Sequence, residues 1–287
     1  MRSKNPLSNP QVRSKLSGLF LRLLVYLGAL ITVGVLLFIV GYILIMGIPH
    51  ITPELFELKY NSNNVSLMPA LINTLFMTAL SLAIAVPLGL CSAIYLVEYT
   101  GRGNKLVGFI RITAETLTGI PSIVYGLFGL LFFVTALGWR MSLIAGAFTL
   151  AIMILPIIMR TTEEALKAVP DTYREGSFGL GTGRLRTVFR ILLPSAMPGI
   201  LAGIILGIGR IVGESAALIY TAGSVPEIAS GLFDSSRTLS VHMYVLASEG
   251  FHTDKTYATA VVLLIIVLLI NTLSALVARK FAKGKES

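Results

Sequence analysis

Long apolar runs alternate with shorter polar segments along almost the whole chain. A run of about 18 or more apolar residues is long enough for a helix to cross the hydrocarbon core of a bilayer. Six runs meet this condition, at residues 19–48, 68–97, 112–137, 141–159, 196–221 and 257–278. The pattern therefore predicts an all-α membrane protein with six transmembrane helices.

The composition and the distribution of charge support this prediction. Charged residues make up 13% of the sequence, against roughly 25% in a typical soluble domain. The net charge is +9, and with the N-terminus inside, 18 Lys and Arg residues fall in inner segments. Four fall in outer segments: Lys59, Arg140, Arg237 and Lys255. This asymmetry follows the positive-inside rule, so we expect both termini in the cytoplasm and no nucleic-acid partner.

The first apolar run stands apart from the other five. We expect residues 1–67 to form a cytoplasmic N-terminal arm, the first transmembrane helix and an outer loop. Residues 68–280 would form a five-span unit with a cytoplasmic loop at 160–194, and residues 281–287 a cytoplasmic tail. The first run is far longer than the roughly 7–15 residues of a signal-peptide core, so it should remain as an anchor. The outer stretch 241–246 is interpreted as part of a short amphipathic helix at the membrane surface or against a partner.

The sequence offers little for catalysis or for binding a cofactor. The glycine cluster at residues 179–183 lacks the Lys and Ser/Thr of a phosphate-binding loop. At no single depth in the membrane does the sequence place a nucleophile together with a base, or two carboxylates together. Cys91 is the only cysteine, and the three histidines, His50, His242 and His252, are interpreted as ordinary polar surface residues. We expect no metal, no cofactor and no enzyme activity on this chain, so any ATP hydrolysis would belong to another polypeptide.

The fifth run carries an intramembrane Arg and Glu. On an ideal helix, with about 100° per residue, one face collects Gly199, Gly203, Gly207, Arg210, Glu214, Ala217 and Thr221. Small residues allow close helix packing, and an Arg near the bilayer centre costs about 2.5–3.5 kcal/mol even on the lenient scale, so it should face protein or water. Two interpretations stay open. In the first, Arg210 and Glu214 form a purely structural ion pair. In the second, Arg210 binds a passing anion, and Glu214 holds the Arg210 side chain in position between one anion and the next.

The third run is interrupted by Thr118-Gly119-Ile120-Pro121-Ser122. A proline inside a helix removes one backbone hydrogen bond and bends the axis. The hydroxyls of Thr118 and Ser122 can satisfy the carbonyls that the bend releases. The segment is thus either a plain kink or a polar bend that lines a transport path.

The polar loop between the fourth and fifth runs has its own local pattern. Pro170 should end the preceding segment, and Thr172 with Glu175 matches a capping box at the start of a short helix. The glycines at 179, 181 and 183 should end that helix and turn the chain. The sequence therefore predicts a short cytoplasmic helix that displays Tyr173, Arg174 and Phe178.

This loop resembles the coupling loop of importer-type ABC permeases, whose pattern is Glu-Ala-Ala, three residues, Gly, nine residues, then Ile-x-Leu-Pro. The matching positions here are Glu175-Gly176-Ser177, Gly181, Ile191, Leu193 and Pro194. Three further runs resemble the PstA-type permeases of phosphate-uptake ABC transporters. They are Gly119-Ile120-Pro121-Ser122-Ile123-Val124-Tyr125-Gly126, Gly209-Arg210-Ile211-Val212-Gly213-Glu214-Ser215-Ala216 and Leu246-Ala247-Ser248-Glu249-Gly250.

The resemblance implies a type I ABC importer permease fold in the cytoplasmic membrane of a bacterium or archaeon. It also implies four kinds of partner: a PstC-type second permease, two ATP-binding subunits, an extracytoplasmic phosphate-binding protein and membrane lipid. Arg210, Glu214, Thr118 and Ser122 would lie on the phosphate path, and Tyr173, Arg174, Glu175 and Gly181 would couple to the ATPase.

Three alternatives remain at this stage. The chain could be the sister PstC-type permease, because that permease shares the Pro-Ser bend and an Arg-x-x-Gly-Glu stretch. It could be a permease for another oxyanion such as molybdate or sulfate. The rival from a different class is a secondary transporter or channel that works without ATP.

Overall fold

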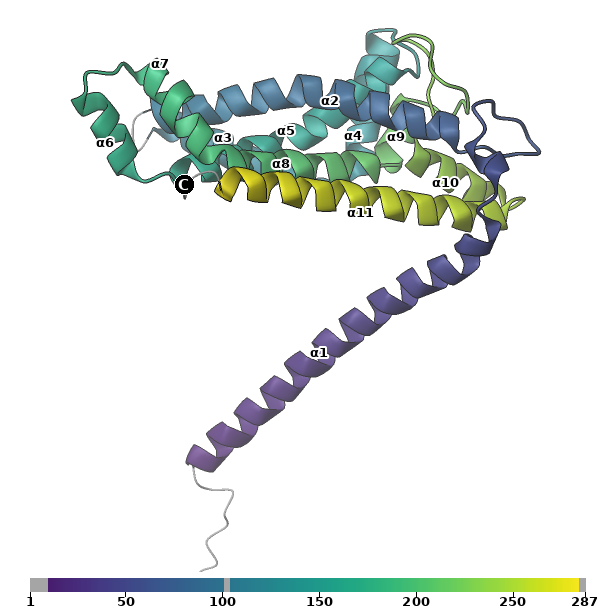
Figure 1. Ribbon diagram of the computed structural model, residues 1–287, viewed down its shortest axis with the longest axis horizontal. Helices are drawn as coiled ribbons and strands as arrows, with labels where there is room; N and C mark the ends of the chain where they lie inside the picture. Colours follow the sequence, from purple (N-terminus) through teal and green to yellow (C-terminus); the bar gives the residue numbers. More distant parts are fainter. Residues whose placement is uncertain (1–9, 101–103, 284–287) are drawn as a thin grey trace, which may run out of the picture.

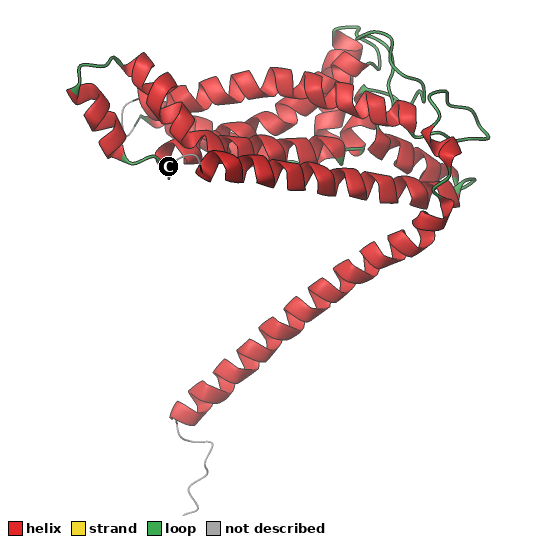
Figure 2. Cartoon of the chain, in the orientation of Figure 1, coloured by secondary structure: helices red, strands yellow, loops and turns green. Residues whose placement is uncertain are grey.

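The computed structural model describes residues 10–100 and 104–283 of the 287-residue chain. Arg2, Lys4, Arg102 and Lys285, which contribute to the predicted inner charge, lie outside the described residues. Over the described ranges the regular structure is helical (Figure 2). The α-helices are α1 (Pro10–Gly47), α2 (Met68–Ile94), α3 (Lys105–Thr118), α4 (Ser122–Gly129), α5 (Leu143–Lys167), α6 (Asp171–Gly179), α7 (Arg184–Thr187), α8 (Leu193–Val212), α9 (Ala216–Thr221), α10 (Leu239–Glu249) and α11 (Thr253–Lys283).

Short 3₁₀ and π-helical segments complete this secondary structure. Two 3₁₀ turns, Ile48–His50 and Pro53–Phe56, follow α1. Three π-helical segments extend neighbouring α-helices: Tyr95–Tyr99 after α2, Leu130–Ala136 after α4 and Val188–Leu192 between α7 and α8.

The membrane spans agree with the predicted all-α membrane fold. Five helical stretches among the described residues are long and apolar enough to cross a bilayer: Leu21–His50, Met68–Tyr99, Leu143–Lys167, Arg184–Val212 and Thr253–Leu273. A sixth is the pair Lys105–Thr118 and Ser122–Ala136, which is bent by 101°. Counting this pair as one broken span gives the predicted six.

Two spans differ from the prediction in detail. The third is broken at Gly119–Pro121 instead of kinked, because Pro121 lacks an amide hydrogen and keeps the residue before it out of the helical region. The fifth begins at Arg184, well before residue 196, and α8 ends at Val212. Residues 184–194, expected in the cytoplasmic loop, are therefore helical and continuous with the fifth span.

The core is built around α5. This helix packs against α2 on one side and α8 on the other, with α11 against α8 (Figure 1). Leu150, Ile154 and Ile158 of α5 are fully buried in the largest hydrophobic cluster. Because α5 leads directly into the loop that holds α6, it connects the centre of the membrane part with the predicted coupling loop.

The helix α1 leaves this bundle, as Figure 1 shows. It contacts α11 near its C-terminal end, where the rings of Tyr42 and Tyr257 are 5.8 Å apart. Gly47 also meets the backbone of Tyr257 closely enough that a Cβ atom would not fit. None of its most apolar window is buried within this chain, so α1 offers a long apolar surface to lipid or to another subunit.

At the opposite end from α6 and α7, α10 packs against α11 and α2 (Figure 1). His242 of α10 is fully buried, so the interpretation of this histidine as a surface residue is wrong. Its Nδ1 lies 3.3 Å from Nη1 of the buried Arg237, and Arg237 in turn stands 5.8 Å from the centre of the Tyr60 ring. Burial, and secondarily the charge of Arg237, lower the pKa of His242 to about 4. The histidine is therefore neutral at pH 7.

Candidate transport site and coupling loop

The two interrupted spans meet inside the bundle. Helix α4, which follows the break at Gly119–Pro121, packs against α9, which follows the break between α8 and α9. Their backbones approach closely, since a Cβ atom on Gly126 would lie 2.8 Å from Cα of Ala217. Broken helices that pack together in this way are typical of transporter sites, because the ends of the half-helices bring polar groups into the membrane.

The first break carries both polar residues that the sequence assigned to a transport path. The Thr118 hydroxyl donates to the Glu115 carbonyl at 2.6 Å, so it satisfies a backbone group as expected. The Ser122 hydroxyl makes no hydrogen bond to any described residue. Instead the Tyr125 hydroxyl donates to the Leu117 carbonyl at 2.8 Å and so bridges the break. Tyr125 belongs to the run 119–126 that resembles phosphate permeases, but no local pattern in the sequence predicts this hydrogen bond.

The second break changes the interpretation of the charged pair. The helix ends at Val212, and residues 213–215 are not helical, so Glu214 does not stand one turn above Arg210. Glu214 is buried, and its Oε1 accepts a hydrogen bond from the Ala217 amide at 3.1 Å, which caps α9. The predicted Arg210–Glu214 ion pair is therefore wrong. The carboxylate serves the backbone of the next helix instead.

Arg210 lies in the last turn of α8, and this position suits a cation because carbonyl oxygens point out of that end of a helix. Its Nε is buried and has no hydrogen-bond partner among the described residues. The guanidinium is close enough to interact electrostatically with Tyr125 across the junction of the two breaks. A buried guanidinium nitrogen without a partner is costly unless a ligand or water supplies an acceptor.

The glycine stripe on α8 packs against α5, as small residues were expected to do. A Cβ on Gly199 would meet the Ala165 side chain at 2.6 Å, and one on Gly203 would overlap Thr161. Gly207 has more space, with its nearest neighbours at 3.9 Å. The expected continuation of this face to Ala217 and Thr221 is wrong, because those residues belong to α9 and face Gly126 and Gly129 of α4.

The predicted coupling loop contains the expected short helix, α6, but without the expected capping box. Pro170 is the N-cap residue, and its side chain makes no capping hydrogen bond. Thr172 therefore lies inside the first turn, two residues too late for its hydroxyl to cap the helix start. Glu175 is exposed and bonds to no described residue.

The C-terminal end of α6 depends on Gly181. This glycine has a φ of +75°, and its amide donates to the Phe178 carbonyl at 2.9 Å. The amide of Thr182 donates to the Ser177 carbonyl at 3.1 Å. These two bonds with a left-handed glycine define a Schellman motif. The glycine of the importer pattern thus ends the helix and turns the chain.

Side chains on α6 point in two directions. Tyr173 is 47% exposed and Phe178 is 44% exposed, so both are displayed as expected. The residues that follow add further exposed apolar side chains, at Leu180, Leu185 and Phe189. Arg174, in contrast, turns inward and forms an ion pair with Glu98 at 2.8 Å. The prediction that Arg174 is displayed on the surface is wrong, and Glu98 was not among the predicted site residues.

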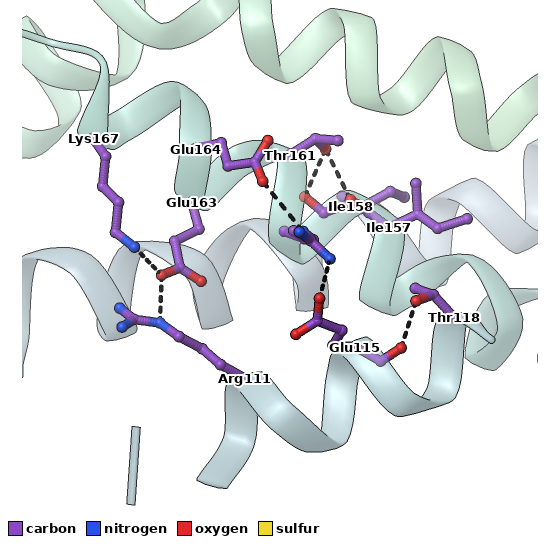
Figure 3. A network of polar contacts seen from close by, with 10 residues as sticks. Arg111, Glu115, Thr118, Ile157, Ile158, Thr161, Glu163, Glu164 and Lys167 are labelled. Carbon is purple, nitrogen blue, oxygen red and sulfur yellow. Dashed lines mark hydrogen bonds and ion pairs between the residues drawn. The ribbon is translucent and has the colours of Figure 1, made fainter. Parts of the chain in front are cut away.

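A second set of ion pairs holds α3 against α5 next to this loop (Figure 3). Glu163 is 7% exposed in its side chain and accepts from Arg111 and Lys167, each at 2.6 Å. Arg160 pairs with Glu115 and with Glu164, each at 3.2 Å. Charged side chains of opposite sign therefore join α3 to the end of α5 that leads into α6.

The geometry thus gives a helical membrane protein with a partly buried cation at the junction of two interrupted helices and a short polar helix at one end. Residues 85–286 match the family described as binding-protein-dependent transport system inner membrane component. The chain belongs to this family. It is a membrane permease subunit of an importer.

Two relatives illustrate the range of similarity within the family. The chain is 34% identical over 261 residues to the probable ABC transporter permease protein YqgI of Bacillus subtilis, covering 85% of this chain and 88% of the relative. It is 38% identical over 212 residues to the phosphate transport system permease protein PstA 1 of Mycobacterium tuberculosis, covering 72% and 69%.

Solved structures of ABC importers have the same fold. A bacterial ABC transporter involved in the import of alginate superimposes with a TM-score of 0.62 at 16% identity, over 91% of this chain and 98% of the other. The inward-facing MetNI methionine transporter gives a TM-score of 0.58 at 21% identity, over 75% and 94%. The predicted type I ABC importer permease fold is confirmed.

Proposed function

We propose that this chain is the PstA-type permease subunit of an ATP-driven importer of inorganic phosphate. It would work in the cytoplasmic membrane of a bacterial or archaeal cell, with both termini in the cytoplasm. We propose a PstC-type second permease, two ATP-binding subunits and an extracytoplasmic phosphate-binding protein as its partners. Catalysis would take place on the ATP-binding subunits, and this chain would need no cofactor of its own.

The observation that carries the proposal is Arg210, whose buried Nε has no hydrogen-bond partner among the described residues. Its planar guanidinium can bind two oxygens of an oxyanion at once, and its charge cannot be lost at physiological pH. Glu214 accepts from the Ala217 amide and forms no ion pair with Arg210 among the described residues. The cation therefore has unsatisfied capacity for an anion such as phosphate, in a chain whose relatives include phosphate permeases.

The coupling loop supplies the ATP-dependent part of the proposal. Exposed apolar side chains on α6 and just after it, including Tyr173, Phe178 and Leu180, form a surface that another protein can cover. Glu175 is exposed on the same short helix and is free to contact a subunit there. We propose that an ATP-binding subunit covers this surface. Thr118 and Ser122 are proposed to line the phosphate path at the first break.

Uptake of labelled phosphate by vesicles that contain the whole complex tests this function. We expect Arg210→Gln to lower ATP-dependent uptake by roughly 10- to 100-fold, the size of a lost hydrogen bond to a charged group. Arg210→Lys should transport poorly, because it keeps the charge but loses the planar geometry. Lys59→Gln, at an exposed outer position, is the matched control and should behave as wild type. Normal uptake by Arg210→Gln would remove Arg210 from the path. Uptake of molybdate or sulfate in preference to phosphate would refute the proposed substrate.

A further inference from the structure

Arg174 lies where three segments of the chain meet, and all five of its N–H groups find acceptors. Nε and Nη2 donate to the Glu98 carboxylate, with the shortest contact at 2.8 Å. Nη1 donates to the Val169 carbonyl at 2.9 Å and to Asp171 at 3.0 Å, and Nη2 also donates to the Leu166 carbonyl at 2.9 Å. No other side chain offers five donors in a fixed plane, so this arrangement requires arginine.

The acceptors belong to separate elements. Glu98 lies in the π-helical segment Tyr95–Tyr99 that extends α2. The Leu166 and Val169 carbonyls lie at the C-terminal end of α5, where a cation also complements the helix dipole. Arg174 itself is on α6. One guanidinium therefore joins the coupling helix to the ends of two membrane helices that already pack against each other.

This joint is less exposed to solvent than the ion pairs of Arg160. The side chains of Arg174 and Glu98 are 15% and 7% exposed, whereas those of Arg160 and Glu115 are 52% and 67% exposed. Exposed ion pairs contribute little because water and salt screen them. A buried pair is strongly disrupted when one partner is removed, because the other charge is left without compensation.

We infer that the Arg174–Glu98 pair is a tether that makes α6 and the end of α2 move as one body when ATP is used. This inference rests on the proposed ATP-coupled function. It assigns Arg174 and Glu98 as positioning residues that act within this chain, and it excludes Arg174 from direct contact with the ATP-binding subunit. Displacement of α6 would then reach α2 and α5 together.

The ratio of phosphate transported to ATP hydrolysed, in vesicles holding the full complex, tests the tether. Glu98→Gln and Arg174→Lys should each lower this ratio between about 2-fold and 30-fold, the range seen when a link between two coupled sites is weakened. The ATP-binding subunits should remain bound in both variants. Arg160→Gln, which breaks only exposed ion pairs, is the matched control and should keep the wild-type ratio.

A distance measurement provides a readout that does not depend on the substrate. Spin labels at Thr172→Cys on α6 and Leu88→Cys on α2, both exposed positions, would be placed in a Cys91→Ser background. With the Arg174–Glu98 pair intact, we expect a single narrow distribution of distances between the two labels that ATP does not change. With Glu98→Gln or Arg174→Lys we expect that distribution to broaden or to become dependent on ATP.

Three results would overturn the inference. The first is a normal ratio and a narrow distance in both variants. The second is a lowered melting temperature with an unchanged ratio, which would make the pair merely stabilising. The third is release of the ATP-binding subunit by Arg174→Lys with normal behaviour of Glu98→Gln, which would place Arg174 at the subunit contact. Absence of phosphate uptake by the wild-type complex would instead refute the proposed function, and the label distances would still decide the tether.

Discussion

Substitution of Gly181 offers a sharp test of how the coupling loop works. Nothing lies within 4 Å of a Cβ atom built on this glycine, so a side chain would meet no steric obstacle within the chain. The cost arises from the backbone alone, because φ is +75°. A residue with a Cβ atom pays roughly 1–2 kcal/mol for the left-handed conformation, and a β-branched residue pays more. We therefore expect Gly181→Val to depopulate the turn after α6 by at least about 5- to 30-fold.

Loss of this turn redirects the chain that leaves α6 and so displaces the exposed residues Leu180 and Leu185. The expected result is that Gly181→Val reaches the membrane but either releases the ATP-binding subunit or hydrolyses ATP without transport. Co-purification of the complex and the ratio of phosphate to ATP measure these two outcomes. Wild-type assembly with a wild-type ratio would refute the role of this turn.

Two further variants separate the backbone explanation from a clash with a partner. Asn tolerates the left-handed region better than Ala does, although its side chain is larger. If the backbone decides, Gly181→Asn should retain more coupling than Gly181→Ala. If the partner's surface rejects any side chain here, the order should be reversed. Gly176→Ala is the matched control, because its Cβ also has no neighbour within 4 Å and its helical backbone should gain up to about 1 kcal/mol.

Two other predictions concern topology and pH. In a cysteine-free background, a membrane-impermeant thiol reagent added outside should label Asn63→Cys and Phe251→Cys but not Leu180→Cys. Strong external labelling at position 180 would show that the proposed orientation in the membrane is wrong. Burial lowers the pKa of His242 from 6.5 to about 4, so between these pH values the unfolded state binds more protons than the folded state. The contribution of His242 to the stability of the folded state is therefore complete above pH 6.5 and is lost as the pH falls toward 4. Through this group, the free energy of unfolding of the purified protein should fall by about 2 kcal/mol between pH 7 and pH 5. The His242→Gln variant should show a correspondingly smaller difference in thermal stability between the two pH values. An unchanged difference would mean that His242 is not held neutral.

Much of the fold follows from the sequence, because the length of an apolar run directly reflects bilayer thickness. The break at residues 213–215 does not follow, because no proline marks it and apolar residues resume directly after Ser215. Angles on an ideal helix placed Glu214 beside Arg210. The helix ends instead because the carboxylate of Glu214 caps α9, and local sequence does not distinguish these two uses of a glutamate.

That the Arg174 side chain points inward could not be predicted from the sequence, for a different reason. The pattern of a nine-residue helix shows that it is polar, but not which side faces the rest of the protein. The partner that decides this, Glu98, lies 76 residues away in sequence and at the end of a different span. Long-range ion pairs of this kind leave no periodic signal. The glycine at 181 was found because its role, a helix stop with positive φ, is local.

The two candidate sites differ in how they are held, and this difference suggests how movement could pass between them. At the end that holds α6, largely buried charges at Arg174, Glu98 and Glu163 join α6, the end of α2, α3 and α5. At the membrane junction, α4 and α9 meet through glycine contacts, and one hydrogen bond from Tyr125 bridges the first break. A displacement of α6 should therefore carry the charged end as a rigid unit, while the breaks absorb the change in backbone angles. Arg210 lies at that more deformable junction, so its access to an anion is the property that we expect such a movement to change.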